Sequence, residues 1–234
     1  MAFDQNRYFS LIQRAAFDAS FYKGTIQDLS SAQRAMSFVG APTWARVNGR
    51  PCLSLRGGAY VRTTVAVAPV IPDLTAQVAY EALFVMPSAT GLIDYLFHQQ
   101  GAAPGGGVSL GVFDTTLANQ NIYMHGIPAG GGNGRYLAVA AGSCPNGRMA
   151  HVVQTAENTF TSGRAWVNGI ARTVTLSDFN PPAVSLVATI RAGGYGFLVP
   201  HGVMIVRVWQ GVTFTNEDAN VLYEAARELT SGEV

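Results

Sequence analysis

Carboxylates are the first side chains to consider for catalysis, because retaining hydrolysis of a glycosidic bond needs two carboxyl groups about 5–5.5 Å apart. A β-strand presents such a pair only when acids alternate along it, since successive side chains point to opposite faces. Glu81 stands alone in its predicted strand, and Glu217 and Asp218 lie where a helix is expected to begin. The sequence therefore predicts no glycosidase pair.

A serine motif is the second candidate, because residues 107–111 read Gly-Val-Ser-Leu-Gly and match the nucleophile elbow of hydrolases. Asp178 and His201 follow in the order that hydrolases use. The elbow requires a strand that turns sharply into a helix, whereas the strand pattern here continues through Val112. We expect Ser109 to be an ordinary strand residue, so no catalytic residue is assigned and the chain is predicted not to be an enzyme.

Metal ligands are not expected in this chain. The four histidines lack the spacing of a zinc site, and the only two cysteines, Cys52 and Cys144, lie far apart and outside any metal motif. His151 falls in a predicted strand, where a packing role is expected. The cysteines are predicted to be buried thiols, with a single disulfide as the alternative. No cofactor is predicted.

Aromatic side chains are the best candidates for contact with a ligand or partner, because sugar sites combine an aromatic platform with a few polar groups. Tyr195 stands out, since the glycines around it would display it on a flexible tip; packing against the sandwich edge is the alternative. Tyr8 and Phe9 belong to the N-terminal arm, residues 1–16, which is either a docking element with a short helix or a segment packed on the sandwich. The other tyrosines considered as platforms are Tyr95, Tyr123 and Tyr136.

Strands dominate the pattern that must position these residues. From Ser37 onward apolar residues recur with period two, which is typical of half-buried β-strands. Asn168-Gly169 predicts a type I′ hairpin turn, because both residues tolerate positive φ. Gly-rich stretches at 101–107 and 130–134 are interpreted as hairpin tips rather than phosphate loops. The predicted strands are 51–55, 60–65, 76–86, 92–98, 108–113, 121–125, 150–155, 164–169, 170–176, 188–192 and 204–212.

Only one convincing helix is predicted, near the C-terminus. Thr215 and Asp218 have the spacing of a capping box, and Leu222 belongs to the apolar face that follows. Many short strands with one terminal helix predict an all-β fold, a two-sheet antiparallel jelly-roll sandwich with one C-terminal helix. Trp166 and Trp209 are expected to fill the space between the two sheets.

Three segments in this order resemble the concanavalin A-like, laminin-G-like jelly-roll superfamily. They are FDASFYKGTIQDLS at 17–30, MAHVVQTAENTFTSGRAWVNGIARTVTL at 149–176 and MIVRVWQGVTFTNEDANVLYEAA at 204–226. The resemblance implies one sandwich domain over residues 17–234, after the arm. Lectins, glucanases, extracellular adhesion domains and bacteriophage virion proteins share this fold, so the fold does not decide the function.

The resemblance also leaves a structural calcium ion as an alternative, because laminin-G-like domains often bind calcium at the rim of the sandwich. No dense acidic loop of the kind that calcium prefers is present, so no metal is predicted. The candidate ligands would be Asp94, Asp114, Asp178 and Asn168.

Low charge is the main compositional feature. Charged residues are 12% of the 234 residues, and the formal net charge is +1; average domains carry about 25% charged residues. Such a surface is typical of subunits that cover one another, so a homo-oligomer is expected. No basic stripe marks nucleic acid, and no apolar stretch is long enough to span a bilayer. The N-terminus lacks the order of a signal peptide, so synthesis in a cytoplasm is expected.

Two functions follow from these features. The first is a non-catalytic virion structural protein, a bacteriophage capsid-decoration (cement) protein or a tail component, located in the virion after synthesis in the host cytoplasm. Its partners would be the major capsid protein or tail proteins, contacted through Tyr8, Phe9 and the Gly-rich loops. The alternative is a carbohydrate-binding, lectin-like adhesion module that binds a glycan near Tyr195.

Overall fold

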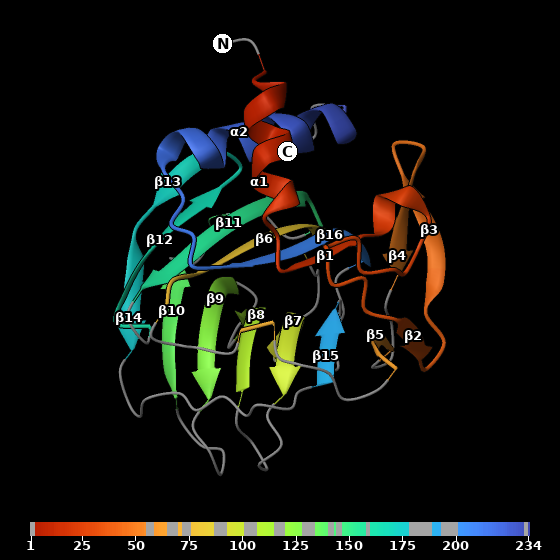
Figure 1. The fold of residues 1–234 in the computed structure, drawn as a ribbon, viewed down its shortest axis with the longest axis horizontal. Coiled ribbons are helices and arrows are strands. Elements are labelled where there is room, and N and C mark those ends of the chain that lie inside the picture. Colours follow the sequence, from red (N-terminus) through yellow and green to blue (C-terminus); the bar gives the residue numbers. More distant parts are fainter. Residues whose placement is uncertain are drawn as a thin grey trace.

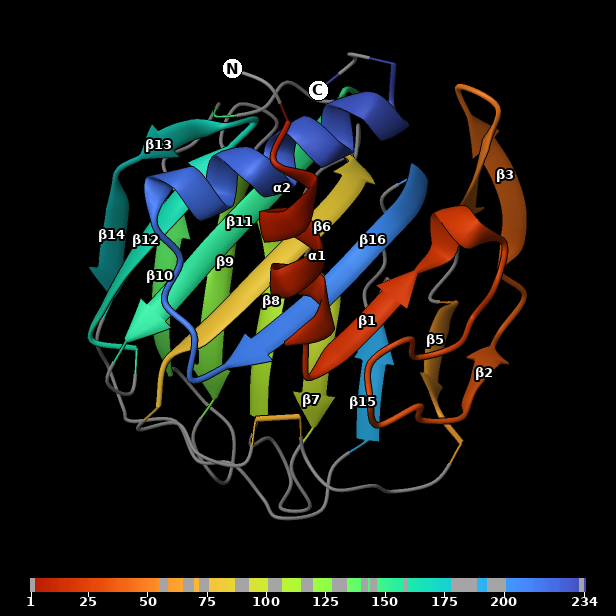
Figure 2. The same cartoon turned by 45° about the horizontal axis from the view of Figure 1, so that its top comes forward.

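Two antiparallel sheets packed face to face form a sandwich, and two helices cover the outer face of one sheet (Figures 1 and 2). This arrangement, seen in a computed structural model, confirms the predicted all-β sandwich with a C-terminal helix. The structure describes residues 3–54, 59–64, 70–71, 76–86, 93–100, 107–114, 120–127, 134–139, 143, 147–157, 160–177, 189–192, 201–231 and 234.

The first sheet, sheet A, lies between the helices and the second sheet (Figure 2). Its longest strands are central, and β1 pairs with β16 beside the main path. In spatial order the strands are β13 (Ile170–Arg172), β12 (Ser162–Val167), β11 (Met149–Glu157), β6 (Val78–Val85), β16 (His201–Gln210), β4 (Arg50–Ser54) and β3 (Thr43–Val47), with β1 (Phe17–Ser20) next to β16.

The second sheet, sheet B, has helices on neither side in the part of the chain that the structure describes. All of its strand pairs are antiparallel, and β7 carries a register shift between Tyr95 and Phe97. In spatial order the strands are β14 (Val174–Ser177), β10 (Arg135–Val139), β9 (Gln120–Ile127), β8 (Gly107–Asp114), β7 (Ile93–Gln100), β15 (Thr189–Ala192), β5 (Tyr60–Thr63) and β2 (Met36–Val39).

Apolar side chains from both sheets fill the space between them. Phe97 of β7 is the aromatic centre of this core, with ring centroids 5.6 Å from Phe17 and 5.5 Å from Tyr80. Leu110 and Val206 from opposite sheets are also fully buried there. This core is the main source of hydrophobic stabilisation, because the apolar area removed from water is largest between the sheets.

The C-terminal helix α2 (Asn216–Leu229) begins as the sequence predicts. The Thr215 side chain accepts a hydrogen bond from the backbone N–H of Asp218, and the Asp218 side chain accepts one from Thr215, which confirms the capping box. Leu222 is fully buried under the helix, so its apolar face packs on sheet A.

The N-terminal arm contains a second helix, α1 (Gln5–Gln13), where the sequence predicted a short helix. Leu11 is buried with the sheet A residues beneath it, and its carbonyl accepts a hydrogen bond from Trp209 Nε1 at 2.8 Å. Arg7 donates to Asp218 Oδ1 at 2.8 Å, so α1 is tied to α2 as well. A single turn of 3₁₀ helix, η1 (Phe21–Lys23), follows β1.

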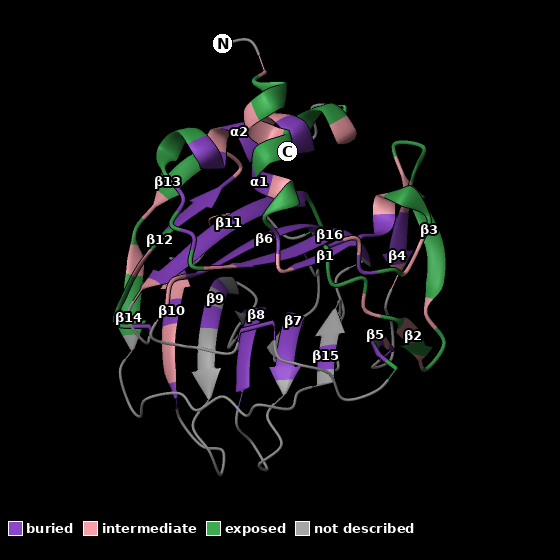
Figure 3. Ribbon diagram, in the orientation of Figure 1, coloured by how far each residue is buried: buried purple, intermediate pink, exposed green. Residues whose placement is uncertain are grey.

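The positions of the two strand tryptophans differ from the prediction. Trp209 and Trp166 face the helices rather than the second sheet: Trp209 stacks edge-on against Phe214, and Trp166 Nε1 donates to Asn216 Oδ1 at 3.0 Å. Both faces of the central strands of sheet A, β6, β11 and β16, are buried (Figure 3). Alternation of apolar and polar residues therefore cannot show which face of this sheet is inside.

Candidate ligand-binding face

Ionisable side chains gather at one place inside the protein, on the helix-facing side of sheet A. Arg207 Nη1 donates to Glu81 Oε2 at 2.8 Å, and Arg207 Nε lies 3.2 Å from Asp18 Oδ1 without hydrogen-bond geometry. Ser20 Oγ accepts from Arg207 Nη2 at 3.1 Å and donates to Asp18 at 2.5 Å. We call Asp18, Ser20, Glu81, His151 and Arg207 the buried ion cluster.

His151 completes the buried ion cluster. Its Nε2 lies 3.0 Å from Glu81 Oε1, and because an ionised carboxylate only accepts hydrogen bonds, Nε2 is the donor. Burial raises the pKa of Glu81, but the charge of Arg207 and the hydrogen bond from His151 together hold this pKa below its usual range. The same two carboxylates, Glu81 and Asp18, hold the pKa of Arg207 well above the usual value although burial opposes this.

The buried ion cluster is closed to solvent, since Glu81, His151 and Arg207 are each 1% exposed. Tyr8 of α1 covers it: its hydroxyl accepts from Arg207 Nη2 at 3.4 Å, and burial raises the pKa of Tyr8 to about 12. Each charge has a partner of opposite sign, and no substrate can reach it. The buried ion cluster therefore joins α1 to sheet A and has no catalytic geometry.

Ser109 lies in the middle of strand β8, as the sequence predicted. The chain does not turn into a helix there, so no nucleophile elbow exists at 107–111. Ser109 is fully buried, and its Oγ has no hydrogen-bond partner among the described residues.

Sheet B carries a row of polar residues that crosses all eight of its strands. Each member is the direct partner of the next in the antiparallel register. We call it the polar row: Ser37, Arg62, Arg191, His98, Ser109, His125, Tyr136 and Ser177.

The row beside it is apolar and shows which face the polar row occupies. Val61, Phe97 and Leu110 belong to this second row and are fully buried in the core between the sheets. Because neighbouring residues of a strand alternate between faces, the polar row belongs to the face turned away from sheet A. The full apolar row is Phe38, Val61, Ala192, Phe97, Leu110, Met124, Leu137 and Leu176.

Exposure along the polar row is uneven. Ser109 and His98 are buried at its centre, Tyr136 is half-buried, and Arg62 is exposed. A ligand could therefore reach the row at its β5 end, where Ser37 of β2 is the direct partner of Arg62.

Two exposed aromatic residues lie on the same side of the molecule as this end of the row. Phe38 follows Ser37 on edge strand β2 and is 41% exposed, and Trp44 on edge strand β3 is 42% exposed. Strands β2, β5 and β3 lie on one side of the sandwich in both views (Figures 1 and 2). Phe38 belongs to the apolar row, so it lies on the opposite face of β2 from Ser37 and Arg62. The β2 edge of the sheet thus carries an apolar platform on one face and polar groups on the other, which are the two kinds of group that sugar-binding surfaces use.

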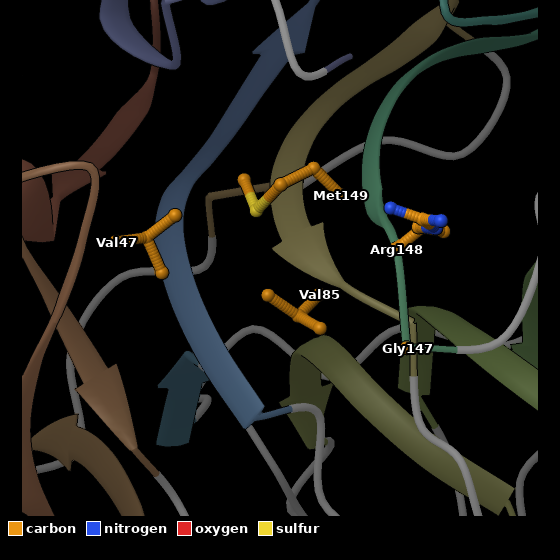
Figure 4. A pocket seen from close by; sticks show the side chains of 5 residues that line it. All are labelled: Val47, Val85, Gly147, Arg148 and Met149. Carbon is orange, nitrogen blue, oxygen red and sulfur yellow. The ribbon is translucent and has the colours of Figure 1, made fainter.

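A pocket of about 430 Å³ lies elsewhere, at the end of sheet A where the β3–β4 hairpin faces β6 and β11. Figure 4 shows Met149 and Val85 between Val47 on one side and Arg148 on the other. The described residues that line the pocket are mostly apolar and include one charged side chain, that of Arg148. Ligand sites usually provide several polar groups that fix the orientation of the ligand. The pocket is therefore a weaker candidate than the polar row.

The aromatic residues that the sequence predicted as contacts for a ligand or partner lie in different parts of the structure. Tyr8 is half-buried on the buried ion cluster, whereas Phe9 is 46% exposed on α1. Tyr195 lies outside the described residues, as do Asp178 and Cys144. Tyr136 is the one platform tyrosine whose side chain the structure describes, and it belongs to the polar row; Tyr95 and Tyr123 are placed by backbone register on strands β7 and β9.

Cys52 is a buried free thiol, and burial raises its pKa. Among the described residues, no three His, Cys, Asp or Glu side chains come together in a way that could hold a metal ion. Asn168, one of the calcium candidates, accepts a hydrogen bond from the backbone N–H of His151 at 2.8 Å and so has a structural role. None of the described helices is long and apolar enough to cross a membrane.

No family model matches this sequence, and no curated protein matches it. Solved structures do match its fold. The binding domain of botulinum neurotoxin DC in complex with SialylT has a TM-score of 0.67 at 11% identity, covering 91% of this chain and 52% of that one. A structure of botulinum neurotoxin type C, whose cell entry depends on two ganglioside molecules, has a TM-score of 0.65 at 9% identity, covering 93% and 52%.

A third similar structure matches over nearly its whole length. It is domain 4 of AbnA, an extracellular GH43 arabinanase from Geobacillus stearothermophilus, in complex with arabinotriose, with a TM-score of 0.61 at 12% identity, covering 90% of this chain and 98% of that one. By contrast, this chain spans about half the length of the neurotoxin structures. These likenesses establish a β-sandwich of the same class.

Proposed function

We propose that this chain is a non-catalytic carbohydrate-binding module. The observation that carries the proposal is the β2 edge of sheet B, where the polar row ends in the exposed Arg62 and the half-buried Ser37 on one face and the exposed ring of Phe38 lies on the other. Hydroxyl and guanidinium groups can donate to sugar oxygens, and the aromatic ring offers an apolar face to the C–H groups of a sugar.

The structural neighbours support the same class of function. Their described ligands are SialylT, two ganglioside molecules and arabinotriose, bound by proteins with a similar sandwich. Fold alone does not determine function, so the proposal rests on the surface of this chain and gains support from the neighbours. The ligand would lie across the exposed β2–β5 end of the sheet.

A glycan array with the purified chain tests the proposal. The wild type is expected to bind a subset of glycans, and Phe38→Ala and Trp44→Ala are expected to weaken that binding, because each removes an exposed aromatic platform. The matched control is Ile170→Ala, since Ile170 is an exposed apolar residue on the far edge of sheet A. An array on which the wild type binds no glycan would contradict the proposal. Tyr195→Ala on the same array tests the loop tyrosine predicted from the sequence.

The exposed Phe9 favours a second candidate, a bacteriophage capsid-decoration or tail protein whose partners contact α1. Phe9 is 46% exposed while Tyr8 and Leu11 on the same helix are committed to contacts within the chain. Deletion of residues 1–16 would remove those contacts and destabilise the test protein, so a loss of incorporation would not be specific. Phe9→Ala is sharper: loss of incorporation into virions with an unchanged unfolding midpoint would support the role, and normal incorporation would contradict it.

A further inference from the structure

We propose that edge strand β3 pairs with β3 of a second copy of this chain, so that sheet A continues through a two-fold homodimer. The proposal goes beyond the proposed function, because it assigns a partner to the edge of sheet A rather than a ligand to sheet B. Strand β3 ends the strand order of sheet A, and β4 is its one hydrogen-bonded neighbour among the described strands. Its other edge therefore presents backbone groups that a further strand can bond.

Strand β3 buries little of itself within one chain. Four of its five residues are exposed, so both faces of the strand are open to water (Figure 3). They are Thr43, Trp44, Ala45 and Arg46, and Trp44 is 42% exposed although it is the largest of them. A two-stranded hairpin with so little cover is marginally stable by itself. A second strand beside β3 would supply the burial that the chain alone does not.

The β3–β4 hairpin determines which backbone groups of β3 face outward. Its two-residue turn, Asn48-Gly49 with φ of 49° and 75°, makes Val47 a hydrogen-bonded partner of β4. Hydrogen-bonded pairs alternate along an antiparallel ladder, so every second residue back from Val47 also bonds to β4. The N–H and C=O groups of Trp44 and Arg46 therefore point to the free edge. In agreement, the residue opposite Arg46 is Pro51, which has no N–H to donate.

These outward groups fit a second copy in one register. When two β3 strands run antiparallel with Ala45 opposite Ala45, Trp44 of each copy lies opposite Arg46 of the other. Both residues of each such pair face outward, so the pair exchanges both of its N–H···O=C bonds. A register centred on Arg46 would oppose like charges. One centred on Trp44 would place Arg46 opposite Pro42, which cannot donate.

The side chains at the opposed positions also suit each other. Residues directly opposite on two strands share a face of the sheet, so Trp44 of one copy would lie beside Arg46 of the other. A guanidinium over an indole ring makes a favourable cation–π contact. Arg46 Nη1 donates to the Gly49 carbonyl at 2.6 Å, which holds the side chain along the hairpin. The flat faces of the guanidinium group remain free to stack.

Other partners fit this edge less well. The opposite edge strand of sheet A, β13, has three residues against five in β3, and short edge strands resist pairing. A foreign peptide could bond the same backbone groups, but the opposed Trp44 and Arg46 are both supplied by this chain, as a self-complementary two-fold interface requires. Charged residues are only 12% of the sequence, which agrees with a surface that a neighbouring subunit covers.

Sedimentation velocity over a range of protein concentrations tests the proposal. The wild type is expected to form a dimer with a measurable dissociation constant. Trp44→Arg should raise this constant about tenfold or more, because each cation–π contact becomes a pair of opposed like charges. The exchange variant, Trp44→Arg with Arg46→Trp, restores both contacts in the same register and should dimerise like the wild type. Ile170→Arg is the matched control, because it adds the same charge to an exposed residue of the other edge strand.

The outcomes distinguish the β3 interface from its alternatives. A wild type that stays monomeric at every concentration overturns the proposal, as does a dimer that Trp44→Arg leaves unchanged. Equal weakening by Ile170→Arg would place the interface at β13 and overturn it too. An exchange variant that keeps the wild-type circular dichroism spectrum but does not dimerise overturns the register centred on Ala45.

Arg46→Glu separates the dimer from the proposed function. It replaces the cation that faces Trp44 and leaves Phe38 and the polar row of sheet B in place. The variant is expected to be monomeric with an unchanged unfolding midpoint, and to bind a monovalent glycan as the wild type does in isothermal titration calorimetry. A variant that still dimerises like the wild type overturns the proposal, whatever its glycan binding.

Discussion

The two outer faces of the sandwich differ in whether their charged side chains have partners of opposite charge. On the helix-covered face of sheet A, Arg207 is surrounded by Glu81 and Asp18, and the whole group is closed to water. On the outer face of sheet B, Arg62 is exposed, is the direct register partner of Arg191 and forms no ion pair with an acid among the described residues. Charge that the fold satisfies internally serves stability, whereas charge that it leaves unbalanced at the surface is available to a ligand.

The buried ion cluster gives the largest predicted effect. Arg207→Met leaves Glu81 and Asp18 buried without their positive partner, so we expect a loss of about 3–5 kcal/mol in the free energy of unfolding. Urea denaturation followed by circular dichroism measures it. Arg164→Met is the control, because Arg164 is exposed on the same sheet, and should change stability by less than about 0.5 kcal/mol.

A second variant keeps this prediction testable if Arg207→Met does not fold. The pair Arg207→Met with Glu81→Met removes charge from both sides, and replacement of buried ions by apolar residues is often neutral or stabilising. The double variant should therefore be more stable than Arg207→Met alone. A single variant as stable as the Arg164 control would show that the cluster does not hold the helix layer to the sheet.

The helix layer itself gives the next largest effect. Leu222 is fully buried between α2 and sheet A, so Leu222→Ala should cost about 2–4 kcal/mol, from lost apolar burial and the cavity left behind. Thermal and urea unfolding measure it. Ile170→Ala removes an exposed apolar side chain instead and should leave the midpoint nearly unchanged. Equal midpoints for Leu222→Ala and the wild type would refute the packing of α2 on the sheet.

The cap of α2 links stability to pH. Burial raises the pKa of Asp218, but hydrogen bonds from Thr215 and Arg7 hold it below its usual value. A carboxyl group with a lowered pKa in the folded state stabilises the protein above its unfolded pKa of about 3.9, and this contribution is lost as pH falls through the folded value. Asp218→Asn should cost about 1 kcal/mol at pH 7 and flatten the loss of stability below about pH 4. An unchanged acid profile in the variant would contradict this.

The sequence predicted elements with local signals best. Thr215 and Asp218 form the capping box, and Asn168 and Gly169 have φ of 50° and 72°, as the type I′ turn requires. These features depend on residues within a few positions of each other. The similar pair Asn48 and Gly49 also has positive φ, at the β3–β4 turn; the same local signal is present there in the sequence.

Features that depend on strand pairing could not be derived from one sequence. Glu81, His151 and Arg207 come from three strands and meet only because β6 lies between β11 and β16. Arg62 and Arg191 are 129 positions apart in the chain and adjacent only through the register of β5 and β15. Local periodicity sets the face of a residue within its own strand, but neither the order nor the register of the strands.

The smallest predicted effect separates the two faces most directly, because it should have the opposite sign. Without ligand, Arg62→Gln removes repulsion from Arg191 and breaks no ion pair with a described acid, so the unfolding midpoint should rise slightly, by less than about 0.5 kcal/mol in free energy. The rise should be largest at low ionic strength, since salt screens exposed charges. A fall in stability of Arg62→Gln, like that expected for Arg207→Met, would contradict this prediction and would show that Arg62 stabilises the fold.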